Sequence, residues 1–204
     1  MNNKVRHVLG LSGGKDSAAL AVHMNNNYPN IPVEYYFTDT GYELSETYDY
    51  LDKLKTRLDK PIKYIQPTNS FDYYMKKYNN FLPSHTARWC TIEMKLKSFE
   101  QWIKPSLDLG TEVFTYIGIR FDERGRIGYK PTNELIKPKF PFIDDHINKE
   151  NFIQLLQNMG YKTYKKDEDV YFIYALNKKN FRKKAKQIDK IDNPFKILSQ
   201  LNLK

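Results

Sequence analysis

One short segment near the beginning of the chain limits most strongly what it can fold into. The segment Val5–Leu11, which ends in the apolar run Val8-Leu9-Gly10-Leu11, has the length of a buried strand. Ser12-Gly13-Gly14-Lys15-Asp16-Ser17 follows it, and an alanine-rich helix is predicted over Asp16–Asn25. A strand that passes through a small-residue turn directly into a helix is the first half of a βαβ unit. We therefore expect an α/β fold with a parallel sheet.

Strand and helix signals continue to alternate along the first 120 residues. Further strands are predicted at Val33–Phe37, Ile62–Gln66 and Val113–Ile119. Helices are predicted at Leu44–Leu58, Phe71–Tyr78 and Trp89–Ile103. Helices that alternate with buried strands cover both faces of a parallel sheet. Beyond these elements, Pro131, Pro138 and Pro141 predict an extended surface segment over Lys130–Asp145.

The length of 204 residues suffices for one α/β domain with a small appendage. We predict the boundary after residue 145, followed by a basic, mainly helical appendage over 146–204 whose first helix lies near Asn148–Asn158. Residues 1–150 hold 21 Lys and Arg against 19 Asp and Glu, whereas residues 151–204 hold 12 against 5. The densest basic run, Lys178–Lys186, contains Phe181 and is typical either of a contact with nucleic-acid phosphates or of a solvated helix face.

Composition excludes several classes of protein. A mean hydropathy of −0.71 with 28 % charged residues excludes a membrane protein, and a 40 % hydrophobic fraction excludes a disordered chain. The single Cys90 excludes an internal disulfide and a metal cluster held only by cysteines of one chain. The apolar run before Ser12 is shorter than that of a secretory signal, so we expect a cytoplasmic protein.

The turn after the first strand has the chemistry of an anion-binding loop. Gly13 and Gly14 allow backbone N–H groups to approach phosphate oxygens, the helix that follows adds positive potential, and Lys15 supplies a cation. The pattern differs from the Walker A loop, in which Ser or Thr directly follows the Lys, because Asp16 occupies that position here. We expect this loop to hold the oxygens of a polyphosphate.

The hexapeptide resembles the pyrophosphate-binding loop of the PP-loop ATP pyrophosphatase superfamily. Three later blocks occur in the order typical of its phosphoadenosine-phosphosulfate reductase-like family: Phe37–Glu43 with Glu46 and Thr47, Arg88-Trp89-Cys90-Thr91 with Lys95, and Gly118–Arg124. Among the members of that family, the chain resembles the DNA-phosphorothioation sulfurtransferases and the small subunit of sulfate adenylyltransferase.

The resemblance implies an adenine nucleotide α-hydrolase-like, Rossmann-like fold over residues 1–145, with ATP across the carboxyl edge of the sheet. It implies phosphate contacts from Ser12, Gly13, Gly14, Lys15, Asp16 and Ser17, adenine near the backbone of Phe37 and Thr38, and a nucleotide contact at Gly118. Asp39 is implied beside the nucleotide as a partner of Mg²⁺, and the alternative is a turn-forming residue.

The same resemblance implies a substrate side of the site. Arg120 would contact the α-phosphate or a substrate anion, with Asp122, Glu123 and Arg124 along the same wall, and for Arg124 and Arg126 a surface role is the alternative. Arg88 and Lys95 would clamp a second anion if one helix includes both, and an exposed amphipathic helix is the alternative. Cys90 is either a sulfur-handling thiol or a small buried hydrophobe. His85 is either an acid or base, or a polar loop residue.

The expected function is ATP-dependent adenylyl transfer with release of pyrophosphate. Lys15, Asp16, Asp39, Arg120 and Cys90 are the expected catalytic residues, and the acceptor is nucleic acid or a small anion, with sulfur from Cys90, a donor or a partner subunit. Residues 151–204 lack the cysteine that sulfonucleotide reductases use, and a single cysteine predicts no iron–sulfur cluster. Two alternatives stay open: an activity like that of the sulfate adenylyltransferase small subunit, and a non-catalytic nucleotide- or nucleic-acid-binding module of a phage or defence system. We expect no membrane partner, and an oligomer is compatible with this function.

Overall fold

The computed structural model of the chain describes residues 4–84, 86–126, 128–166 and 169–173. Its backbone contacts divide the chain into two compact units, Met1–Lys149 and Glu150–Lys204. The first unit contains every residue that the sequence analysis placed in the nucleotide site.

A five-stranded parallel sheet forms the centre of the first unit. Its strands are β1 (Val5–Leu11), β2 (Val33–Thr38), β3 (Ile62–Ile65), β4 (Glu112–Tyr116) and β5 (Ile136–Lys139), in the spatial order β3-β2-β1-β4-β5. The predicted parallel α/β sheet is therefore confirmed. The strand order reverses between β1 and β4, and in open parallel sheets the carboxyl edge at such a reversal is where ligands bind.

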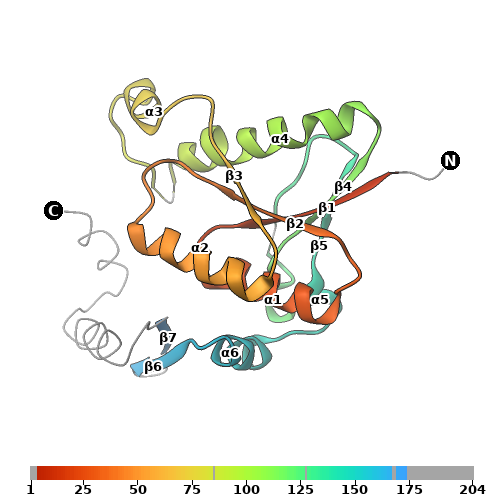
Figure 1. Ribbon diagram of the computed structural model, residues 1–204. Helices are drawn as coiled ribbons and strands as arrows, with labels where there is room; N and C mark the ends of the chain where they lie inside the picture. The colour runs from red at the N-terminus through yellow and green to blue at the C-terminus, as the bar shows by residue number, and fades with distance from the viewer. Residues whose placement is uncertain (1–3, 85, 127, 167–168, 174–204) are drawn as a thin grey trace. The chain divides into compact units, whose positions relative to one another are not determined.

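Helices cover both faces of this sheet (Figure 1). The chain moves from β1 outwards to β3 and then returns to the other side of β1, and right-handed crossovers in opposite directions place their helices on opposite faces. One face carries α1 (Lys15–Asn27) and α2 (Ser45–Leu58); the other carries α4 (Lys97–Asp108), which follows α3 (Phe71–Lys77) and the π-helix η1 (Cys90–Leu96).

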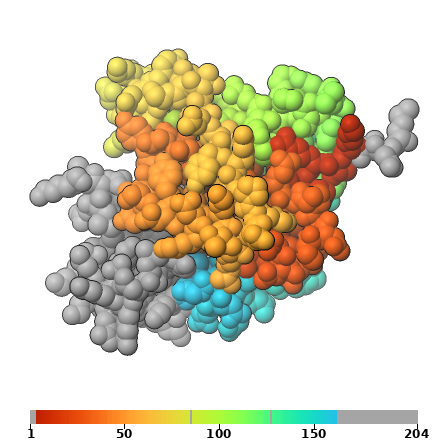
Figure 2. Space-filling model, in the orientation of Figure 1, coloured from red at the N-terminus to blue at the C-terminus, as the bar shows by residue number. Residues whose placement is uncertain are grey.

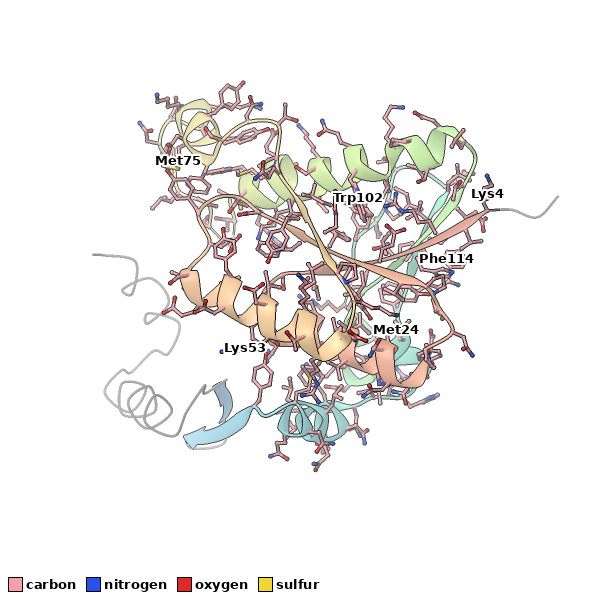
Figure 3. All side chains as sticks on the ribbon, viewed as in Figure 1. Lys4, Met24, Lys53, Met75, Trp102 and Phe114 are labelled. Carbon is pink, nitrogen blue, oxygen red and sulfur yellow. The ribbon has the colours of Figure 1, made fainter. Side chains whose placement is uncertain are left out.

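The two layers of the core differ in side-chain size. On α1, the buried run from Ala18 to Met24 includes three alanines, which allow the helix to lie close to the sheet. Between α4 and the sheet, Phe99 and Ile103 pack with Val8 and Val113. Trp102 adds to this layer by reaching from α4 towards the sheet (Figure 3). Phe99 of this layer also lines a cavity at the carboxyl edge of the sheet.

The expectation of an extended surface segment over Lys130–Asp145 is wrong. This segment contains β5, which pairs with β4 through bonds such as Ile117 N–H to the Lys139 carbonyl at 2.9 Å, and the short helix α5 (Pro141–Asp144). Pro138 is tolerated because β5 is an edge strand, on which a missing N–H facing away from β4 costs no ladder bond. Pro141 occupies the start of α5, where proline is favoured.

The single helix predicted over Trp89–Ile103 is two elements. The π-helix η1 runs from Cys90 to Leu96, and α4 continues from it to Asp108 with Pro105 inside. Spacings of three and four along the sequence do not distinguish a π-turn from an α-turn, so this segment was predicted as continuous α-helix. A short 3₁₀ turn, η2 (Phe121–Glu123), follows β4.

The second unit contains nearly all of α6 (Lys149–Asn158) and an antiparallel hairpin of β6 (Lys162–Lys166) and β7 (Asp169–Ile173). The helix agrees with the expected one, whereas the hairpin was not predicted. The basic run 178–186 and His85 lie outside the described residues. Among the described residues, no helix has both the length and the apolar character that a membrane span requires.

Candidate functional site

The loop between β1 and α1 has a backbone shape that only glycine adopts easily. Gly13 has a φ of +72°, and a Cβ built there would lie 2.6 Å from the Cγ2 atom of Thr47 on α2. The loop is braced from inside: the Ser12 N–H and Ser12 Oγ both lie 3.1 Å from Ser17 Oγ. Gly14 is the N-cap of α1, and no side chain among the described residues caps this helix end. The first N–H groups of α1 therefore point out of the loop, as an oxyanion site requires.

Lys15 and Asp16 form an ion pair at the rim of the loop. The Lys15 ammonium lies 3.1 Å from the Asp16 carboxylate, and both side chains are roughly two-fifths exposed. An ion pair this exposed is weak. Lys15 can therefore exchange its carboxylate partner for a phosphate oxygen at little cost.

A cavity of about 650 Å³ opens at the carboxyl edge of β1 and β4. Its volume lies within the range typical of small-molecule sites. Its polar lining comes from the loop, from the ends of β4 and from two arginines, and its apolar lining comes from β2, η1 and α4. The lining includes Gly10, Ser12, Asp16, Ser17, Leu20, Tyr36, Arg88, Thr91, Ile92, Leu96, Phe99, Thr115, Tyr116, Ile117, Gly118, Ile119, Arg126, Gly128 and Tyr129.

The apolar end of the cavity is aromatic. Tyr36 stacks on Phe99 with ring centroids 5.2 Å apart, and Tyr129 meets Phe99 edge-on. Gly10 makes this arrangement possible, because a Cβ there would lie 2.8 Å from the Tyr36 hydroxyl oxygen. Tyr129 donates to Glu100 at 2.8 Å. Burial raises the pKa of Tyr36 and, together with the Glu100 bond, that of Tyr129, so both hydroxyls stay protonated. This aromatic wall was not predicted from the sequence. The one sequence signal for it is the Tyr35-Tyr36 pair, because successive strand residues face opposite layers and one of the two rings must face this side of the sheet.

Gly118 lies where β4 meets the beginning of α1. A Cβ at this position would lie 3.2 Å from the backbone oxygen of Asp16. The close approach brings the end of β4 against the phosphate loop and makes both of them walls of one cavity. The predicted contact residue Gly118 is thus placed beside the loop.

Arg120 lies among carboxylates and is not part of the cavity lining. It is 16 % exposed, its NH2 group lies 2.8 Å from Glu123, and its Nε atom lies 3.3 Å from Asp122. Burial alone would lower the pKa of Arg120, but the Asp122 bond and the charges of Glu123, Asp122 and Asp16 raise it. Arg124 lies over the Phe121 ring at 4.9 Å. Of the arginines after β4, Arg126 is the one in the described lining.

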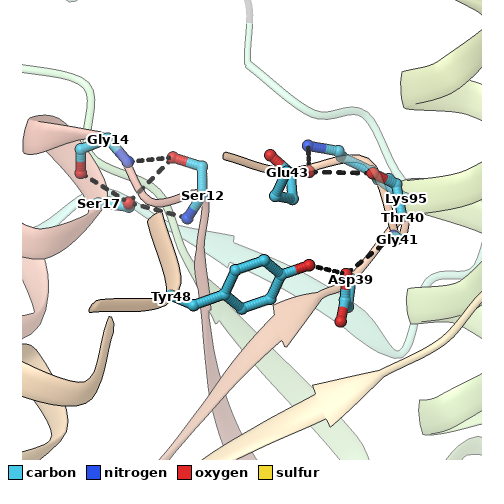
Figure 4. Close-up of polar contacts among 9 residues, drawn as sticks. All are labelled: Ser12, Gly14, Ser17, Asp39, Thr40, Gly41, Glu43, Tyr48 and Lys95. Atoms are coloured by element: carbon cyan, nitrogen blue, oxygen red, sulfur yellow. Dashed lines mark hydrogen bonds and ion pairs between the residues drawn. The ribbon is translucent and has the colours of Figure 1, made fainter. Parts of the chain in front are cut away.

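Asp39 is held within the loop after β2 (Figure 4). Its Oδ1 atom accepts a hydrogen bond from the Gly41 N–H at 2.9 Å and one from the Tyr48 hydroxyl at 2.7 Å. The bond to Asp39 raises the pKa of Tyr48 to about 12. These are the bonds of a turn-forming residue, the alternative to a magnesium partner. Phe37 and Thr38 are both buried at the end of β2.

Arg88 and Lys95 do not form the expected pair. Arg88 precedes the helix and lines the cavity, whereas Lys95 lies 3.4 Å from Glu43, which also accepts from Thr40 (Figure 4). The expectation that both project from one helix face is wrong, because the helix begins after Arg88 and its first turns are π-helical. Their separation of seven residues therefore does not correspond to two α-helical turns.

A comparison with known protein families identifies the family of the chain. Residues 6–135 match the phosphoadenosine phosphosulfate reductase domain. The chain belongs to this family. Its fold is similar to that of the phosphoadenylyl-sulfate (PAPS) reductase from Candida auris in its phosphate complex, with a TM-score of 0.53, 15 % identity, and coverage of 81 % of this chain and 83 % of that one. The Rossmann-like fold implied by the sequence motifs is confirmed.

Other relatives extend the comparison. The chain is 27 % identical over 139 residues, 65 % of its length, to an uncharacterized protein of Methanocaldococcus jannaschii, and 27 % identical over 165 residues, 57 % of its length, to an uncharacterized 37.8 kDa protein of Escherichia phage 186. It spans 32 % of the archaeal protein and 48 % of the phage protein. The U34-tRNA thiolase NcsA from Methanococcus maripaludis, solved with its [4Fe-4S] cluster, aligns with a TM-score of 0.44 at 20 % identity over 92 % of this chain and 66 % of that one.

The match covers residues 6–135 and so includes the single cysteine of the chain, Cys90. The Cys90 side chain is half-buried and packs against the cluster of Tyr74, Trp89 and Met94. Burial raises the pKa of its thiol, Lys95 opposes the rise, and Glu43 adds to it. A thiol of raised pKa is less readily a thiolate. The apolar neighbours and the raised pKa of Cys90 are those of a small hydrophobe rather than of an activated thiol.

Proposed function

We propose that the protein binds ATP in the cavity and transfers its adenylyl group, with release of pyrophosphate. The observation that carries the proposal is the loop: a glycine-only turn, braced by Ser12 and Ser17, opens an uncapped helix end into a cavity that also contains arginine. Such a loop binds a run of phosphate oxygens through backbone N–H groups.

The two ends of the cavity match the two ends of the nucleotide. The β- and γ-phosphates lie on the loop, where Lys15 exchanges Asp16 for a phosphate oxygen. The adenine lies at the aromatic end, where Tyr36, stacked on the buried Phe99, and Tyr129 line the cavity beside β2. The α-phosphorus then lies between them, beside Gly118 and within reach of the acceptor.

The reaction follows from this position. An acceptor oxygen forms a bond to the α-phosphorus, the bond to the bridging oxygen breaks, and its electron pair leaves with pyrophosphate, while the acceptor proton passes to water. Lys15 and Arg126 hold and neutralise the oxygens on which charge develops. Arg120 interacts electrostatically with Asp16 and would act on the loop through that carboxylate.

Magnesium fits the donor set in the manner usual for nucleotides. Mg²⁺ takes most of its ligands from phosphates and water and only one or two from carboxylates. Asp16 lines the cavity, and the second carboxylate oxygen of Asp39 is the other candidate. Among the residues that the structure describes, no cluster of three or more His, Cys, Asp or Glu side chains forms a metal site of its own. When bound, the ion would offset the charge of the departing pyrophosphate.

The acceptor is an anion or part of one. Arg88 and Arg126 both line the cavity and would attract a nucleic-acid segment or a small anion such as sulfate. We propose nucleic acid as the acceptor, with sulfur delivered afterwards by a donor or a partner subunit.

Product analysis tests this proposal. ATP labelled at the α- or the γ-phosphate is incubated with the protein and Mg²⁺, with an oligonucleotide or with sulfate. The expected products are an adenylated acceptor or AMP, together with pyrophosphate. Lys15→Ala is expected to lower the rate by at least about 100-fold, whereas Lys53→Ala, which removes an exposed lysine of α2, leaves it unchanged. ADP with orthophosphate, or ATP binding without any product, would overturn the proposal.

A further inference from the structure

Five large apolar side chains are exposed beside the cavity, and we call them the aromatic platform. Their exposed fractions range from 50 % to 71 %, and they come from the loop after β2, from α3, from the loop after it and from η1: Tyr42, Tyr73, Phe81, Leu82 and Ile92. The surface around α3 is visible at the upper left of Figure 2. Tyr42 packs on Phe71 and Tyr73 on Tyr74, and both partners belong to the cluster around Trp89. Exposed apolar side chains gathered around one cluster mark a candidate interaction site.

The platform is continuous with the cavity. Tyr42 stacks on Phe71 with centroids 4.5 Å apart, and Phe71 lies 5.2 Å from the buried Trp89. The Trp89 indole N–H donates to the Phe81 carbonyl at 2.9 Å. Ile92 belongs both to the platform and to the cavity lining. Ile92 is therefore the residue through which the platform adjoins the cavity.

Tyr42 and the cluster beneath the platform are held by stacking and by a hydrogen bond. Tyr78 stacks on Trp89 at 5.4 Å, and the Tyr42 hydroxyl donates to Asp72 at 2.7 Å. With one face of Tyr42 on Phe71, its other face is turned outwards. Ordered rings lose little conformational freedom on binding, so such a surface is suited to stacking.

The segments around the platform carry more cations than carboxylates. The five Lys and Arg are Lys76, Lys77, Arg88, Lys95 and Lys97, and the carboxylates are Asp72, Glu93 and Glu43, the last of which pairs with Lys95. Glu93 is buried and neutralised by Lys77 and Lys97. Exposed rings interleaved with cations are the arrangement that binds single-stranded nucleic acid, because bases stack on the rings and phosphates pair with the cations. A duplex hides its base faces and would use only the cations.

We propose that the aromatic platform binds single-stranded nucleic acid and presents it to the cavity as the acceptor. The binding half of this statement stands on the platform alone, and the presentation half rests on the proposed adenylyl transfer.

The test measures binding of the full chain to a fluorescein-labelled single strand of about 12 nucleotides, within the site size of one binding fold. Phe81→Ala and Tyr73→Ala are expected to weaken binding by at least about fivefold each, the effect of losing one stacked base. Both residues are half-exposed or more, and neither lines the cavity, so ATP binding is unchanged. Leu109→Ala is the matched control, because it also removes an exposed apolar side chain, 80 % exposed, at the far end of α4.

Three outcomes would overturn the proposal. The first is equal binding by the platform variants and the wild type, and the second is equal weakening by Leu109→Ala. The third is equal affinity for the duplex of the same sequence, which would indicate phosphate contacts alone. No oligonucleotide binding, together with self-association that Phe81→Ala abolishes, would assign the platform to a protein partner instead. Product analysis on the same samples separates the two proposals: ring-dependent binding without ATP cleavage keeps the platform and rejects the transfer.

Discussion

At the scale of single residues, Gly13 couples the phosphate loop to a helix that follows much later in the chain. Its positive φ gives the loop its curvature, and its missing side chain leaves room for Thr47 of α2. Thr47 lies in the segment that resembles the second family block, so two blocks that are separate in sequence meet at one glycine. The loop and α2 are therefore in close contact at Gly13 and Thr47.

Gly13→Ala is expected to damage the site more than backbone strain alone explains. The left-handed conformation costs an alanine about 1–2 kcal/mol, and the new methyl group would also overlap Thr47 at 2.6 Å. Gly110→Ala provides the control, because Gly110 has a similar φ of +71° and nothing within 4 Å of its Cβ position. Urea unfolding and ATP titration are measured for both. Equal losses of stability and unchanged ATP affinity in Gly13→Ala would contradict the coupling.

The residues of the site differ in how well the sequence predicts them. The loop from Ser12 to Ser17 is predictable because its chemistry is local: a strand, two glycines, a cation and a helix are consecutive. The Arg88 and Lys95 pair was mispredicted because its geometry depends on where a helix begins. The aromatic wall of Tyr36, Phe99 and Tyr129 was missed because three distant segments build it, and no local pattern marks their meeting.

At the scale of elements, the site depends on the distance between the end of β4 and the beginning of α1. Gly118 sets this distance, because its Cβ position is 3.2 Å from the Asp16 carbonyl oxygen. A displacement of a few tenths of an ångström at α1 would turn its N–H groups away from the phosphates.

Gly118→Ala is therefore expected to weaken ATP binding by roughly tenfold, since small misplacements of binding groups are costly. The fold tolerates the change, because the clash is slight. Gly125→Ala, in the loop that follows, has nothing within 4 Å of its Cβ position and should bind ATP as the wild type does. Isothermal titration compares the two variants, and equal affinities would show that the β4–α1 distance is not critical.

Glu93 joins three elements through charged hydrogen bonds. It accepts from Lys77 of α3 at 3.0 Å, from Lys97 of α4 at 2.7 Å and from Tyr78 at 2.9 Å, and it belongs itself to η1. These bonds, that from Lys97 foremost, lower its pKa from 4.5 to about 2. The carboxylate of Glu93 thus links α3, η1 and α4, and the first two of these carry platform residues.

The lowered pKa predicts a loss of stability in acid. A carboxylate with a depressed folded-state pKa stabilises the fold fully above its unfolded value of 4.5, and this contribution is lost as the pH falls towards 2. Glu93→Gln should be less stable at neutral pH and should flatten the fall between these two values. Urea unfolding across this range measures it. Asp108→Asn, which removes an ion pair with both partners more than half exposed, is the control and should keep the fall.

Element prediction from the sequence succeeded where a period was clear and failed where backbone chemistry was exceptional. The strand β1 was predicted at its observed bounds, because a run of apolar residues ends at a glycine turn. The strand β5 was missed because Pro138 argues against a strand except at a sheet edge, and edge position is a property of the whole sheet.

At the scale of the whole molecule, charge is distributed unevenly between the two parts of the chain. The first 150 residues are close to neutral, at +2, and the last 54 carry +7. The two proposed contacts would differ in kind: the aromatic platform would stack on bases, and the C-terminal basic run would pair with phosphates. The salt dependence of the affinity distinguishes the two contacts. Each phosphate contact releases counterions and so steepens the slope of log affinity against log salt, whereas stacking on a base releases none.

We propose that the C-terminal run Lys178, Lys179, Arg182, Lys183, Lys184 and Lys186 contacts the phosphates of the acceptor. Each contacted phosphate of a single strand contributes about −0.7 to the slope of log affinity against log salt. Replacing Lys183, Lys184 and Lys186 with Gln is therefore expected to flatten the slope by about 2 if all three make contacts. Phe81→Ala should instead lower affinity at every salt concentration and leave the slope unchanged.

The matched control for this triple variant is Lys53→Gln, Lys55→Gln and Lys63→Gln, which removes the same charge from exposed positions of α2 and β3. Fluorescence anisotropy over a salt series compares the two triple variants with the wild type. A general attraction to a basic protein would flatten both slopes equally, because it depends on net charge alone. A specific contact flattens only the C-terminal slope, and in that case ATP binding stays intact, since Lys15 and the rest of the phosphate loop belong to the first unit. Equal slopes would reject the contact and favour a small anion such as sulfate as the acceptor.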